Sequence, residues 1–181
     1  SHYSNDEYLY WLCDKYGLYI MAETNAECHQ FLDARKDASM FKEMFLDRQA
    51  TTFNRLKNYT SIVMWSICNE TFYNTDASWS DYMFAEAIWY FKDRDTTRPV
   101  HAEGATGKGL AQGVAWMGVD VSSHMYPTID QVQARANDST GLPYVMCEYD
   151  HAMGNAVGSL NDYWDIVRSS DNMMGGFIWD W

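Results

Sequence analysis

The stretch Val145–Asn155, VMCEYDHAMGN, is an apolar run that ends in one glutamate, followed by an aromatic residue, a histidine and a glycine turn. Glu148 therefore stands at the carboxyl end of a predicted buried strand. The stretch Ile62–Glu70, IVMWSICNE, repeats this arrangement and ends in Glu70. A carboxylate is costly to bury and is usually kept for chemistry. Two carboxylates at strand ends predict an active site built on a pair of glutamates.

Short apolar strands alternate with helical patterns along the rest of the chain. The predicted helices are Asn5–Tyr16, Met40–Leu56, Trp79–Phe91, Ile129–Ala136 and Leu160–Val167. The predicted strands are Leu18–Ala22, Ser61–Ile67, Val100–Glu103, Val119–Ser122, Pro143–Tyr149 and Gly175–Trp179. This alternation is typical of parallel β/α units, in which the functional residues gather at the carboxyl ends of the strands.

Two α/β architectures share this pattern, the (β/α)8 TIM barrel and the open, doubly wound sheet. The first strand is not followed by a glycine-rich phosphate-binding turn, which favours the barrel. Only six strands are found, so we expect an incomplete TIM barrel that lacks the first two of eight strands and has a shortened last unit. Six strands cannot close a barrel. Residues 1–181 are therefore predicted to be a single partial catalytic domain of a longer polypeptide.

Composition excludes several classes of partner. The net charge of the 181 residues is −12, which argues against binding to nucleic acids or anionic membranes and favours a neutral substrate. The sequence contains no apolar run of membrane-spanning length and no signal-peptide pattern. Four cysteines without CxxC spacing favour a reducing compartment, the cytoplasm. Aromatic residues make up 16% of the chain, which suits either a heavy core or stacking on sugars.

The paired glutamates suit glycoside hydrolysis, which needs one carboxylic acid for the leaving oxygen and one carboxylate at the sugar carbon. Asn69 precedes Glu70 and suits a bond to a sugar hydroxyl or an ordinary turn. Glu27 and His29, two residues apart in a loop, would form with Glu70 a set suited to Mg²⁺ or Mn²⁺. Taken alone, the Glu-x-His motif is weak, and a solvated loop is the favoured interpretation of Glu27 and His29.

Four further polar or aromatic residues lie at predicted strand exits. Trp179 offers a ring face that could stack on a sugar, or it is a core tryptophan. For the other three, a bond to a sugar hydroxyl and an ordinary packing or capping role both remain open; they are His2, Tyr126 and His151.

With these residues in place, the chain resembles the catalytic barrel of the β-galactosidase branch of glycoside hydrolase family two, nearly from end to end. The wider family resemblance rests on Trp65–Glu70, WSICNE, and the narrower one on Cys147–Asn155, CEYDHAMGN. Supporting segments are Ser1–Tyr3, Cys13–Tyr19, Glu27–His29, Met125–Pro127 and Gly175–Trp181.

The resemblance implies that Glu148 is the nucleophile and Glu70 the acid/base, and that Mg²⁺ is bound by Glu27, His29 and Glu70. It further implies galactosyl contacts, with Trp179 as the stacking platform; the contact residues are His2, Asn69, Tyr126, His151 and Trp179. A sodium site of the family would lie outside this span. Asp150 departs from the family pattern, and we expect it either to raise the pKa of Glu148 or to face solvent.

Together these features predict a retaining exo-β-galactosidase that acts on a β-galactoside such as lactose, with its carboxyl groups about 5–5.5 Å apart. The full protein is expected to be a homo-oligomer. Two alternatives remain at this point. One is a carbohydrate-binding or structural barrel fragment that is inactive without the rest of its polypeptide. The other is a metal-dependent hydrolase that uses Glu27, His29 and Glu70.

Overall fold

The structure is a computed structural model that describes residues 1–27, 38–71, 78–103, 118–138 and 141–180. Within these ranges helices alternate with strands. The helices are α1 (Glu7–Tyr16), α2 (Ala38–Leu56), α3 (Ser78–Lys92), α5 (Ile129–Ala136) and α6 (Leu160–Arg168). The strands are β1 (Ile20–Glu23), β2 (Ile62–Ser66), β3 (Val100–His101), β4 (Ser122–Met125), β5 (Tyr144–Tyr149) and β6 (Met173–Ile178).

Local sequence signals set the ends of several helices. The Asp6 side chain accepts a hydrogen bond from the Tyr8 amide and begins α1, and Gly17, at φ +72°, ends it in the left-handed conformation. At α5, Thr128 and Gln131 form a reciprocal capping box. Among the described residues, none of the helices combines the length and apolar character that a membrane span requires.

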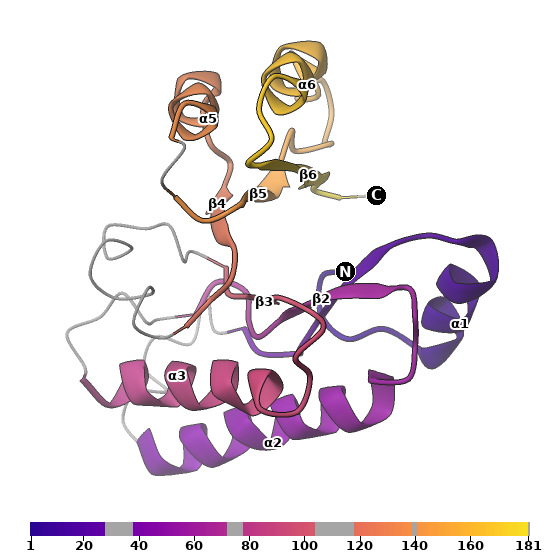
Figure 1. Cartoon of the computed structure of the whole chain (residues 1–181), viewed down its shortest axis with the longest axis vertical. Helices are drawn as coiled ribbons and strands as arrows, with labels where there is room; N and C mark the ends of the chain where they lie inside the picture. The colour runs from indigo at the N-terminus through magenta and orange to yellow at the C-terminus, as the bar shows by residue number, and fades with distance from the viewer. Residues whose placement is uncertain (28–37, 72–77, 104–117, 139–140, 181) are drawn as a thin grey trace.

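The described strands form two parallel sheets, in the orders β1-β2-β3 and β4-β5-β6. Figure 1 shows α2 and α3 on the outer side of the first sheet and α5 and α6 on the outer side of the second, so that the strands lie between the helices. Between the sheets, Met21 and Met64 share one buried cluster with Val121 and Val145. Helices outside and apolar side chains inside are the arrangement of a β/α barrel.

The larger core lies between the first sheet and its helices. Trp65, fully buried on β2, packs against Phe53 of α2 and Phe91 of α3, with ring centroids 5.6 and 5.2 Å away. Its indole Nε1 donates a hydrogen bond of 2.9 Å to Asp95 Oδ2. Part of the aromatic content of the chain thus goes into this core, which packs β2 against α2 and α3.

The predicted fold class is confirmed, with α/β units, parallel strands and an incomplete barrel. Most elements differ from prediction by one to three residues at an end. The largest difference is β4, predicted at Val119–Ser122 and found at Ser122–Met125. Val119 and Val121 are buried, but Asp120 between them accepts the Val100 amide with its side chain, and regular pairing with β5 begins only at Ser122.

The contacts of the Asp95 carboxylate predict that part of the free energy of unfolding depends on pH in the acid range. Burial alone would raise its pKa, but hydrogen bonds from Thr97 and Trp65 hold the pKa below its ordinary value. The stabilisation by ionised Asp95 is therefore complete above the pKa of an aspartate in the unfolded chain, about 4. It is lost as the pH falls below that value and the carboxyl becomes protonated. We expect Asp95→Asn to lower the free energy of unfolding by about 1–2 kcal/mol at pH 7.

Urea unfolding at pH 7 and at low pH measures this effect. The difference between Asp95→Asn and the unchanged protein should shrink as the carboxyl becomes protonated. The matched control is Asp93→Asn, two residues earlier and exposed. An equal loss at every pH would show that the charge of Asp95 contributes nothing.

Candidate active site

Glu148 lies on β5, the central strand of the second sheet, and is 8% exposed. Its backbone carbonyl accepts the Tyr126 amide at 2.7 Å, which brings the residue after β4 beside it. Burial raises the pKa of the Glu148 carboxyl, and the hydrogen bond from the Tyr126 hydroxyl and the nearby His2 oppose this rise. The tyrosine hydroxyl therefore favours the ionised form of a carboxyl that burial disfavours.

Glu70 follows β2, the central strand of the first sheet. Its backbone has a φ of +43°, in the left-handed region, and its amide donates a hydrogen bond of 2.8 Å to Oε2 of Glu103. Burial, together with the charges of Glu70, Glu148 and Glu23, raises the pKa of Glu103 to about 7, against the opposing effect of the Glu70 amide. A third, buried carboxyl group thus lies in direct contact with the residue predicted to be the acid/base.

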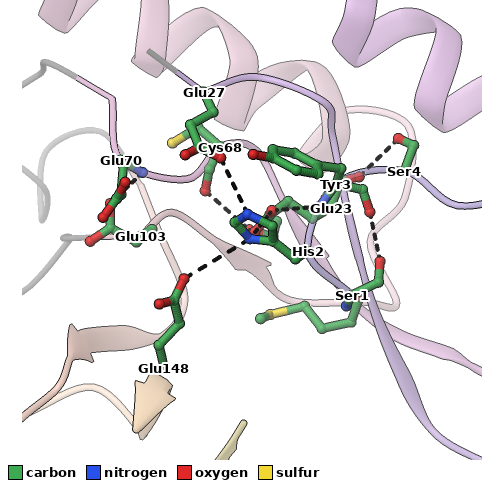
Figure 2. A network of polar contacts seen from close by, with 12 residues as sticks. Ser1, His2, Tyr3, Ser4, Glu23, Glu27, Cys68, Glu70, Glu103 and Glu148 are labelled. Atoms are coloured by element: carbon green, nitrogen blue, oxygen red, sulfur yellow. Dashed lines mark hydrogen bonds and ion pairs between the residues drawn. The ribbon is translucent and has the colours of Figure 1, made fainter. Parts of the chain in front are cut away.

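Glu70 and Glu148 come from different sheets and meet at the same end of the barrel. The charge of Glu70 is one of the influences that raise the pKa of Glu148. Figure 2 shows the Glu148 carboxylate directed toward Glu103, Glu70 and His2. The two predicted catalytic carboxyl groups therefore share one electrostatic environment.

His2 lies between three carboxylates. Its Nδ1 is 3.9 Å from Oε1 of Glu23 and 4.0 Å from Oε1 of Glu148, and its Nε2 is 3.4 Å from Oε2 of Glu27 (Figure 2). Beside it, a hydrogen bond to Glu27 raises the pKa of Tyr3 to about 12, so that its hydroxyl keeps its proton. His2 is thus placed to bridge β1 and β5 through their acidic ends.

A cavity of about 500 Å³ opens beside this cluster. The predicted sugar-contacting residues His2, Asn69 and Trp179 line it together with Glu148. Trp179 stacks on His151 with ring centroids 4.5 Å apart and planes at 15°, and the Tyr126 ring lies 5.9 Å from His151. The structure therefore brings together all the predicted catalytic and sugar-contacting residues.

The predicted metal ligands are only partly described, because His29 lies outside the described residues. Glu27 pairs with Asn69 in an isolated parallel bridge, which places it beside the end of β2 that bears Glu70. Its Oε2 atom is buried and accepts no hydrogen bond from the described residues. This oxygen lies 3.4 Å from His2 Nε2, and a carboxylate oxygen without a hydrogen bond is a hard donor that suits Mg²⁺. The described residues contain no group of three or more acidic, His or Cys side chains placed to hold an ion.

Two buried glutamates at this face were not among the predicted site residues. Glu23 ends β1, accepts the Tyr3 amide at 3.0 Å through Oε1 and accepts the Ser66 hydroxyl at 3.0 Å through Oε2. Glu103 follows β3. Each ends or follows an apolar strand, the same sequence signal that singled out Glu70 and Glu148.

Strained backbone is concentrated at this face. Most of the described non-glycine residues with a left-handed φ follow a strand or adjoin His2; these are Tyr3, Glu70, Tyr126 and Asp150. Such conformations cost of order 1–3 kcal/mol each and persist only where the surroundings enforce them. Their gathering at the carboxyl ends of the strands indicates a functional site.

Parallel β/α units whose carboxylates gather at the carboxyl ends of the strands define the catalytic face of a β/α-barrel enzyme. The sequence model described as "Glycosyl hydrolases family 2, TIM barrel domain" matches residues 1–181. The chain belongs to this family, and the predicted resemblance is confirmed.

Curated relatives narrow the comparison. The β-galactosidase of Priestia megaterium is 37% identical over 190 residues, which cover 100% of this chain and 17% of that protein. The β-galactosidase of Lactococcus lactis is 34% identical over 193 residues, which cover 100% of this chain and 18% of that protein. The chain thus spans less than a fifth of the length of these relatives.

Solved structures share the fold. The family 2 β-galacturonidase of Eisenbergiella tayi, bound to galacturonate, superposes with a TM-score of 0.75 at 23% identity, over 98% of this chain and 36% of that chain. At this level of identity the likeness shows the architecture alone.

The contact between Tyr126 and Glu148 gives a prediction that does not depend on catalysis. Because the hydroxyl lowers the pKa of the carboxyl, Tyr126→Phe should raise the pKa of Glu148. Carbon NMR titration of labelled glutamate side chains measures it. Tyr163→Phe is the matched control, since the Tyr163 hydroxyl donates to the Pro127 carbonyl instead. An unchanged or lowered pKa in Tyr126→Phe would contradict the assignment.

Proposed function

We propose that the chain is the catalytic barrel of a retaining exo-β-galactosidase. The observation that carries the proposal is the placement of Glu70 and Glu148, from different sheets, on one face of the barrel within electrostatic influence of each other. Relatives that bear the name β-galactosidase and are aligned over the whole chain support the choice of sugar.

In the first step, an oxygen of the Glu148 carboxylate forms a bond to the anomeric carbon as the bond to the aglycone oxygen breaks. Glu70 gives its proton to that oxygen. In the second step, Glu70 takes a proton from water, whose oxygen displaces Glu148 and releases galactose with retained configuration. Tyr126 favours the ionised form of Glu148 that the first step needs.

Three of the proposed sugar-binding side chains, His2, Asn69 and Trp179, line the cavity. The Tyr126 ring lies beside His151, which in turn stacks on Trp179. We assign hydroxyl contacts to His2, Asn69, Tyr126 and His151, and ring stacking to Trp179, whose orientation is fixed by its stack on His151. Glu27, His29 and Glu70 would hold Mg²⁺, which supplies positive charge beside the acid/base.

Electrostatics favour a neutral sugar over a uronic acid. The cavity is lined by the acidic residues Glu23, Glu148 and Asp180, by His2 and, among the described residues, by no lysine or arginine. A sugar carboxylate would need a cationic partner and would meet repulsion here. A galactoside such as lactose meets neither problem. We further propose that the active protein contains the rest of the parent polypeptide and assembles as a homo-oligomer.

Removal of the nucleophile tests the mechanism. Glu148→Ala should lower kcat on a chromogenic β-galactoside by about 10⁴-fold or more. Azide should restore turnover and give the inverted, α-configured galactosyl azide, because it attacks from the side that Glu148 occupied. The assay uses a polypeptide that extends beyond these 181 residues, with the 181-residue chain in parallel.

The matched variant is Glu70→Ala, in which Glu148 remains. With a good leaving group, azide should then attack the glycosyl-enzyme and give the β-configured azide. The same anomer from both variants, or no rescue of Glu148→Ala by any small nucleophile, would overturn the assignment.

Chelation separates this mechanism from that of a metal-dependent hydrolase. Because the carboxyl groups carry out both steps, a saturating chelator should reduce kcat but leave measurable activity, and added Mg²⁺ should restore the rest. Complete loss of activity at saturating chelator would favour the metal-dependent alternative. The measurement is initial rate against chelator concentration.

A further inference from the structure

We propose that Glu103 is a positioning residue for the acid/base: its carboxylate fixes the backbone of Glu70 and thereby the place from which Glu70 delivers its proton. This inference rests on the proposed function of Glu70. Glu103 lies just after β3 and is 9% exposed. Figure 2 shows it directly beside Glu70.

The end of β2 is held from both sides. The Asn69 amide donates to the Ala26 carbonyl at 3.0 Å, on the side of β1, and the next amide, that of Glu70, donates to Oε2 of Glu103 at 2.8 Å, on the side of β3. The regular ladder of β2 ends at Ser66. Beyond it, these two bonds tie Asn69 and Glu70 to opposite neighbours, so that the two side chains leave the strand in fixed directions.

The strained conformation of Glu70 makes the bond from its amide important. At φ +43° the backbone would relax if nothing enforced it. Loss of this bond would leave the Glu70 amide unsatisfied in a half-buried position. The carboxylate of Glu103 is therefore the contact that keeps Glu70 in place from the side of β3.

The test compares leaving groups in the full-length polypeptide. With an aglycone that leaves readily, such as dinitrophenol, the first step needs no proton from Glu70; with phenol as the aglycone it does. If Glu103→Ala displaces Glu70 by about 1 Å, kcat/KM on the phenyl β-galactoside should fall by about 100-fold. On the dinitrophenyl β-galactoside it should change little. Loss of general stability would lower both values together.

Two variants refine the comparison. Glu103→Gln keeps an oxygen at the same reach that can accept the Glu70 amide, so it should retain most of the activity on both substrates. Asp120→Ala is the matched control, because Asp120 also accepts a backbone amide with its carboxylate, that of Val100 at 2.9 Å, at the opposite end of β3. It should leave the ratio of the two kcat/KM values unchanged.

Glu70→Ala separates the two proposals. It should show the same dependence on the leaving group, and more strongly. If it does not, Glu70 is not the acid and both proposals fail. Suppose that Glu70→Ala shows the dependence on the leaving group, but that Glu103→Ala lowers kcat/KM equally on both substrates or on neither. Only the inference about Glu103 is then overturned. Should Glu103→Ala not fold, Glu103→Asp, shorter by one methylene, carries the same test.

Discussion

The site depends on the crowding of carboxylates at one end of the strands. Glu23, Glu103 and Glu148 are each no more than 9% exposed, and Glu27 and Glu70 lie beside them. Like charges taken out of water repel and lose hydration, so such a cluster persists only if hydrogen-bond donors and protons compensate it. Here the donors come from residues around the rim. They are the amides of Tyr3 and Glu70, the hydroxyls of Ser66 and Tyr126, and the imidazole of His2.

The distribution of these donors gives chemically similar carboxyl groups different roles. Both oxygens of Glu23 accept hydrogen bonds, which ties this carboxylate into the wall of the barrel. Glu148 has the Tyr126 hydroxyl and the more distant His2, and it lines the cavity. Glu103 directs one oxygen to the Glu70 backbone. Environment, more than residue type, therefore distinguishes a glutamate held in the barrel wall from one that lines the cavity.

Much of the fold could be predicted from the sequence because its signals are local. Apolar runs mark β2 and β5, and Gly17 marks the end of α1. The observed start of β4 differs from the predicted one because regular pairing depends on Tyr144, a partner distant in sequence. The site residues are predicted from strand ends and from the family resemblance. Glu103 carries the same strand-end signal, but its bond to Glu70 links residues 33 positions apart, and no pattern within one strand reveals it.

Asp150 shows how such long-range information resolves an ambiguity. From the sequence, a carboxylate two residues after Glu148 either raises the pKa of the nucleophile or faces solvent. In the structure Oδ1 accepts the Gly158 amide at 2.9 Å, and Oδ2 is buried. The leading influences on the pKa of Glu148 are burial, the Tyr126 hydroxyl and His2. At φ +50° it closes the turn that follows β5, and the next residue, His151, then meets Trp179. A departure from the family pattern two residues after Glu148 thus bears on how the aromatic pair His151 and Trp179 is held.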